Sequence, residues 1–179
     1  MRKFYVSLLA AFLFIFESLF VNQVSGLFAD GDKILAPRFL MLFLVFMAAY
    51  SNNRKALWYS FVLGLLFDIV YTEILGVYMA IFPVIIYMVG KLMKMLQNNI
   101  FVVSFISLVA VVMLECIIAG FHSLIGSLNM SISEFMSIRL LPTLLLNTGA
   151  VVLFAFPFKY VITKFGTDAE GDMLFRRGR

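Results

Sequence analysis

Histidine and cysteine are almost missing from this sequence, which has one of each, His122 and Cys116. A single cysteine cannot build a disulfide framework, and the two residues are too few for a thiol or histidine metal site. The patterns G-x-x-x-x-G-K-S/T, G-x-S-x-G and H-E-x-x-H, which mark NTPases, serine hydrolases and zinc proteases, are also missing. We therefore expect no metal, no cofactor and no enzymatic activity.

Charged residues are also scarce. They make up 13% of the 179 residues, whereas hydrophobic residues make up 63% and the mean hydropathy is +1.03. Soluble domains contain roughly 45–50% apolar residues, so a soluble fold could not bury this much apolar surface. The net charge of +4 comes from basic residues that lie between the apolar runs, where they set membrane orientation. This composition predicts an integral membrane protein and argues against nucleic-acid binding.

Six apolar runs alternate with short polar connections, which predicts an all-α membrane domain with six transmembrane helices in one bundle. Runs of about 17–25 apolar residues are long enough to cross a bilayer. The predicted domain covers residues 1–165, and residues 166–179 form a short polar tail. The predicted spans are about 4–21, 34–50, 56–72, 75–90, 100–122 and 140–163.

The first run allows a second interpretation. Its basic start and apolar core are typical of a signal peptide, with Val24, Ser25 and Gly26 as a small-residue cleavage site. Against this, the run reaches the spanning threshold of about 18 residues and contains Glu17. We therefore interpret residues 4–21 as a membrane span.

Basic residues divide unequally between the two sides of six alternating spans. Cytoplasmic loops are enriched in lysine and arginine, so the richer side, which holds both termini, is predicted to be cytoplasmic. Cleavage of the first run would leave this orientation unchanged. The richer side has eleven basic residues, namely Arg2, Lys3, Arg54, Lys55, Lys91, Lys94, Lys159, Lys164, Arg176, Arg177 and Arg179, and the other side has three, Lys33, Arg38 and Arg139.

Five charged residues lie inside or at the ends of the apolar runs at one predicted depth. Glu17, Asp68 and Glu115 fall late in outward-running spans, and Arg38 and Arg139 begin inward-running ones. A charge in the bilayer is expensive unless it is paired. We predict that Arg38 or Arg139 pairs with Asp68 or Glu115 in the outer half. A pairing that only fixes helix register, a ligand site or proton path, and unpaired snorkelling side chains all remain open.

The segment from residue 60 to 90 carries the most specific pattern. Gly64 precedes Asp68 by one helical turn, so both lie on one face, where the missing side chain lets a neighbouring helix come close. With Pro37 and Arg38 opening the second run and Pro142 in the sixth, the chain resembles the bacterial rod shape-determining MreD family. The residues that carry the resemblance are Gly64, Asp68, Leu75, Gly76 and Tyr87.

This resemblance implies a non-enzymatic, multi-pass component of the bacterial plasma membrane that supports cell elongation. The partners it implies are the membrane protein MreC and, indirectly, MreB filaments and the glycosyltransferase and transpeptidase pair that makes peptidoglycan. Association of the chain with further copies of itself is an open alternative. The family's fold is similar to the substrate-binding subunits of energy-coupling-factor vitamin transporters, which are the alternative function. Those subunits carry small residues four apart on their first span, and Ser7 and Ala11 are the nearest approach to that pattern here.

Overall fold

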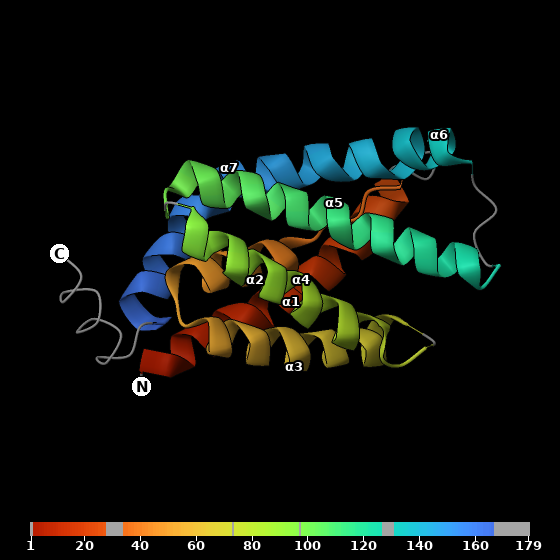
Figure 1. Ribbon diagram of the computed structural model, residues 1–179. Helices are drawn as coiled ribbons and strands as arrows, with labels where there is room; N and C mark the ends of the chain where they lie inside the picture. The colour runs from red at the N-terminus through yellow and green to blue at the C-terminus, as the bar shows by residue number, and fades with distance from the viewer. Residues whose placement is uncertain (1, 28–33, 73, 97, 127–130, 167–179) are drawn as a thin grey trace.

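The computed structural model describes residues 2–27, 34–72, 74–96, 98–126 and 131–166, and for residues 2–4 and 22–27 the backbone alone. Within these ranges all regular structure is helical (Figure 1). The predicted tail lies outside the described residues, except for Gly166. The elements are α1 (Arg2–Leu27), α2 (Phe39–Tyr50), α3 (Asn53–Tyr71), α4 (Val77–Met95), α5 (Ile100–Leu124), α6 (Ile132–Glu134), the π-helix η1 (Phe135–Leu140), α7 (Leu141–Val161) and the π-helix η2 (Ile162–Gly166).

Among the described residues, three helices are long and apolar enough to cross a membrane: Val77–Met95, Ile100–Leu124 and the continuous helix Ile132–Gly166. Two shorter apolar helices cover Tyr5–Val21 and Phe39–Tyr50. The protein is thus an all-helical membrane protein over its described part. Each of the six predicted runs contains a helix, whereas six complete crossings and the orientation of the termini remain predictions.

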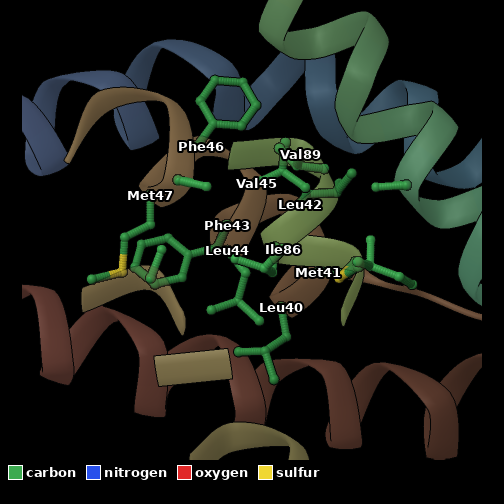
Figure 2. Close-up of a cluster of buried hydrophobic side chains, with 14 of the residues drawn as sticks. Leu40, Met41, Leu42, Phe43, Leu44, Val45, Phe46, Met47, Ile86 and Val89 are labelled. Atoms are coloured by element: carbon green, nitrogen blue, oxygen red, sulfur yellow. The ribbon is translucent and has the colours of Figure 1, made fainter. Parts of the chain in front are cut away.

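Helix α2 lies in the middle of the bundle and contacts α1, α3, α4, α5 and α7. Every residue from Phe39 to Ala49 is buried, and Figure 2 shows its side chains packed with Ile86 and Val89 of α4. A helix that is apolar all round is stable only when it is surrounded, which explains the run FLMLFLVFMAA. With 12 residues, α2 is about 18 Å long, shorter than the roughly 30 Å of a bilayer's hydrocarbon core.

The start of α2 differs from the sequence prediction. A helical run was predicted from about residue 34 with Pro37 in its first turn, but residues 34–38 are not helical and α2 begins at Phe39. The reason is tertiary, because the last long helix supplies hydrogen-bond partners for this non-helical backbone. These partners are described with the site below.

The last long helix begins at Ile132, before the predicted span that starts at about residue 140. Ser131 and Glu134 form a capping box in which each side chain accepts a hydrogen bond from the other residue's backbone N–H. Pro142 disturbs this helix, because proline lacks an N–H and its ring clashes with the preceding turn. The disturbance is a wide π-helical turn at Phe135–Leu140, and the helix then continues as α7.

Candidate functional site

Two arginines share one buried carboxylate where α2, α5 and η1 meet. Arg38 Nε lies 2.6 Å from Glu115 Oε1, and Arg139 Nε lies 2.8 Å from Glu115 Oε2. The Glu115 side chain is 0% exposed, that of Arg38 7% and that of Arg139 18%. Removing three charges from water is unfavourable, and their attraction offsets this only with good geometry. Both oxygens of Glu115 are used, so the three side chains hold α2, α5 and the last long helix in one arrangement.

Arg38 also lies against two aromatic rings. Its guanidinium carbon is 5.9 Å from the ring centroid of Phe67 and 5.7 Å from that of Tyr78. Its Nη2 donates to the Tyr78 hydroxyl at 3.4 Å. A cation near aromatic faces is stabilised most when water is excluded. Arg38 therefore connects the ion pairs to the α3–α4 hairpin.

Glu17 satisfies a free backbone group at the start of α2. The first N–H groups of a helix have no partner inside it and attract negative charge. Leu40 N donates to Glu17 Oε2 at 2.9 Å, and the Glu17 residue is only 3% exposed. Because this backbone segment follows Arg38 directly, Glu17 fixes α1 beside the arginine.

Asp68 contacts neither arginine. Of the two acids predicted as arginine partners, the structure pairs Glu115 with both, while Asp68 binds backbone N–H groups at the start of α4. Its carboxylate accepts from Gly76 at 3.0 Å, Tyr78 at 2.9 Å and Met79 at 2.9 Å. The residue is 0% exposed. A carboxylate at a helix N-terminus satisfies orphan donors and the helix dipole together, which gives this buried acid its partner.

The two glycines of the pattern allow this hairpin to close. A Cβ at Gly64 would lie 2.6 Å from the carbonyl oxygen of Tyr78, so α3 and α4 touch backbone to backbone there. Gly76 has φ of +107° and is the N-cap of α4. Side chains disfavour this left-handed region, so glycine lets the chain turn and present its N–H to Asp68.

Sequence reasoning missed the residues that hold the non-helical segment 34–38. Ala36 N donates to Thr143 Oγ1 at 3.2 Å, and Arg38 N donates to Asn147 Oδ1 at 2.9 Å. Asn147 Nδ2 donates in turn to the Ala36 carbonyl at 3.1 Å. Thr143 and Asn147 are one helical turn apart on α7. Two polar residues four apart in an apolar run were the available signal, because such residues face a protein interior.

Pro142 lacks an N–H, and this leaves one carbonyl of the last long helix free to bind the segment 34–38. In a regular helix its N–H would donate to the carbonyl of Ile138, four residues earlier. That carbonyl instead accepts from Ile34 N at 2.8 Å. Non-helical backbone at membrane depth is tolerated only where protein satisfies its polar groups. The free Ile138 carbonyl before Pro142 and the side chains of Thr143 and Asn147 together supply the hydrogen-bond partners of the non-helical segment 34–38.

We call Glu17, Arg38, Asp68, Glu115 and Arg139 the polar cluster. Their carboxylates and guanidinium groups are engaged with other parts of the same chain. Within the described ranges, the one buried side-chain nitrogen or oxygen without a hydrogen-bond partner is Asn53 Oδ1, which lies against Gly90. The described residues also contain no group of three His, Cys, Asp or Glu side chains that could hold a metal ion. The arrangement pairs both arginines with Glu115 and gives the carboxylates of Glu17 and Asp68 backbone N–H partners.

Fold and cluster together define a helical membrane protein whose buried charges are paired within its own chain. More particularly, the chain belongs to the MreD family, since the family described as rod shape-determining protein MreD matches residues 1–165.

Two relatives are similar over most of the chain. Rod shape-determining protein MreD of Bacillus subtilis (strain 168) is 40% identical over 159 residues, which cover 89% of this chain and 92% of the relative. Cell shape-determining protein MreD of Streptococcus pneumoniae (strain ATCC BAA-255 / R6) is 27% identical over 143 residues, 78% of this chain and 84% of the relative. No solved structure matches the chain.

Proposed function

We propose that this protein is a non-enzymatic membrane scaffold that helps to determine cell shape in a rod-shaped bacterium. The observation that carries the proposal is the family match over residues 1–165, together with the two similar proteins named as shape determinants. We further propose that it is a multi-pass protein of the plasma membrane with both termini in the cytoplasm. The charge distribution of the sequence supports that orientation.

The polar cluster supports a scaffold. A catalytic or transport site needs polar groups that are available to a substrate, whereas here Glu115 and Asp68 have their oxygens engaged by Arg38, Arg139 and the start of α4. The centre of the bundle is occupied by the apolar side chains of α2 (Figure 2). We propose that the cluster fixes the helix positions, so that the outer helix faces present a constant surface to a partner.

We propose that this partner is MreC, bound through helix contacts in the membrane. Through it the protein would act with MreB filaments and with the glycosyltransferase and transpeptidase pair that extends the lateral peptidoglycan wall. A rigid membrane bundle suits this role because partner helices in a bilayer associate by close packing.

Depletion of the protein combined with affinity purification from native membranes tests the proposal. We expect rod-shaped cells to become round or wide on depletion, and MreC to co-purify with the tagged full-length chain. Glu115→Gln should weaken both complementation and MreC recovery if the cluster positions the helices. Normal rods after depletion would contradict the proposal. So would an eluate that contains an ATPase module and stoichiometric vitamin in place of MreC.

A further inference from the structure

Pro157, inside α7, leaves one carbonyl of that helix without its usual donor. In a regular helix the N–H of residue 157 would bind the carbonyl of Leu153, and proline has no N–H. Pro142 creates the same gap at Ile138, but there Ile34 N fills it at 2.8 Å. Among the described residues, no hydrogen bond from outside the helix reaches the Leu153 carbonyl. The chain therefore satisfies one of these two carbonyls and leaves the other open.

The open carbonyl lies on the face of α7 that points away from the bundle. Leu153 is 71% exposed, and Pro157, one turn further along, is exposed as well. Leu153 precedes Lys159 by six positions, about 9 Å along the helix axis, so it lies inside the apolar part of the span. The carbonyl of Met79, which Pro83 frees in the same way, belongs to a half-buried residue of α4. The Leu153 carbonyl is the more accessible of the two.

Gly149 lies on the same face of α7, one turn before Leu153. Val152 and Phe156 beside it are each 72% exposed, and a Cβ at Gly149 would have no neighbour within 4 Å in the described structure. Packing within the chain therefore does not explain a glycine here. Glycine is unfavourable inside a helix compared with alanine, whereas at a helix–helix contact in a membrane it lets two backbones come close. The apolar face thus has a low point at Gly149 that suits a neighbouring helix.

The open carbonyl indicates which molecule covers this face. Its oxygen carries a partial negative charge and needs a donor, and the hydrocarbon of a lipid has none. A second copy of the chain would be related by an axis along the membrane normal, so that each residue at the contact meets its own counterpart. The Leu153 carbonyl would then face another such carbonyl, and the side chains of Val152, Phe156 and Pro157 carry no donor. Complementarity therefore favours a helix of a different protein.

We propose that the face of α7 around Gly149 and Leu153 binds one transmembrane helix of the partner proposed above, and that this helix carries a hydroxyl or amide side chain that donates to the Leu153 carbonyl. The inference rests on the proposed partnership and adds where the contact lies and which chemistry it uses. Close approach at Gly149 brings the partner's backbone near enough for a short polar side chain to reach the carbonyl.

Binding of full-length MreC to the full-length protein in proteoliposomes, followed by FRET between the labelled proteins, tests the site. Gly149→Leu fills the low point of the face and should weaken MreC binding about tenfold or more. Gly120→Leu is the matched control, because a Cβ at Gly120 also has no neighbour within 4 Å but belongs to α5. This control should bind MreC as the wild type does, and both variants should keep the wild-type Tm.

Pro157→Ala tests the carbonyl separately from the shape of the face. Alanine restores the N–H that binds the Leu153 carbonyl within the helix, so the Tm of the protein alone should equal or exceed that of the wild type. MreC binding should nevertheless weaken by about threefold to fifteenfold, the range expected for one interhelical hydrogen bond. A variant that affected folding alone would not separate the two measurements in this direction.

Photocrosslinking locates the contact directly. A photoreactive amino acid in place of Val152 should crosslink to MreC, whereas the same group in place of Val62 of α3, on the opposite side of the bundle in Figure 1, should not. Unchanged MreC binding in Gly149→Leu and Pro157→Ala would overturn the inference and leave the proposed partnership intact. A crosslink from position 152 to a second copy of the chain would also overturn it. Failure of the wild type to bind MreC would contradict the proposed partnership, and this inference with it.

Discussion

The polar cluster and the opposite end of the bundle carry their charges in different surroundings. We call this opposite end the basic end, and its described basic residues are Arg54, Lys55, Lys91, Lys94, Lys159 and Lys164. In the cluster, Arg38 and Glu115 are almost fully buried, and each has an oppositely charged or hydrogen-bonding partner on the chain. At the basic end, the lysines are half-buried or exposed, and the described contacts of Lys91, Lys159 and Lys164 include aromatic rings. A charge in a low-dielectric interior needs a partner within the protein, whereas a charge at the interface is stabilised by water, ions or lipid headgroups. We therefore expect the free energy of unfolding to depend strongly on the polar cluster and only weakly on the basic end.

Breaking the shared carboxylate should have the largest effect. Glu115→Gln keeps the shape of the side chain but leaves Arg38 and Arg139 without a counter-charge, which should lower the free energy of unfolding by about 3–5 kcal/mol. Unfolding in detergent, followed by circular dichroism, measures the loss.

The same substitution at an exposed acid is the control. Glu134→Gln changes an exposed residue in the capping box at the start of α6, and water screens its charge, so this variant should lose far less stability than Glu115→Gln. Equal losses for the two variants would show that burial of Glu115 carries no special weight.

Asp68→Asn should have the second largest effect. Both carboxylate oxygens accept backbone N–H groups, and the amide of asparagine offers one acceptor and places a donor against donors. Buried hydrogen bonds to a charged group contribute about 1.5–3 kcal/mol, so we expect a loss of about 2–3 kcal/mol. Unchanged folding, abundance and partner recovery in membranes would remove the case for Asp68 as an anchor of the α3–α4 hairpin.

Gly64→Ala tests the close approach of α3 and α4. The added Cβ would meet the carbonyl of Tyr78, and backbone cannot move aside as a flexible side chain can. Overpacking of this kind typically destabilises by about 1–3 kcal/mol, and we expect about 2. Gly120→Ala is the matched control, because a Cβ there has no neighbour within 4 Å. It should be neutral or slightly stabilising, since alanine favours helix. Similar Tm values for the two variants would contradict the assigned contact.

The smallest effect is expected at the basic end. Lys91 is exposed, and its Nζ lies 4.8 Å from the ring centroid of Tyr87. Exposed contacts of this type contribute about 0.5–1 kcal/mol at most, so Lys91→Gln should change the free energy of unfolding by about 0.5 kcal/mol or less. A loss comparable to that of Glu115→Gln would remove the distinction between the two regions.

Much of the helix inventory could be predicted because apolar runs and caps are local signals. The capping box of Ser131 and Glu134 is an example, since its two hydrogen bonds need only residues three apart. The start of α2 could not be predicted in this way. Residues 34–38 leave the helix because Thr143 and Asn147 satisfy their backbone, and those residues lie more than a hundred positions away.

In the polar cluster, too, the sequence predicted one part of the arrangement and the tertiary structure decided the other. By itself the sequence determined that Glu17, Arg38, Asp68, Glu115 and Arg139 lie in or at the ends of apolar runs, where a charge without a partner is expensive. Only the tertiary structure decided that both arginines share Glu115 while Asp68 binds the start of α4. The physical reason is that composition and spacing fix the cost of burial, whereas hydrogen bonds require partners within about 3 Å, and those distances are set by how the helices pack.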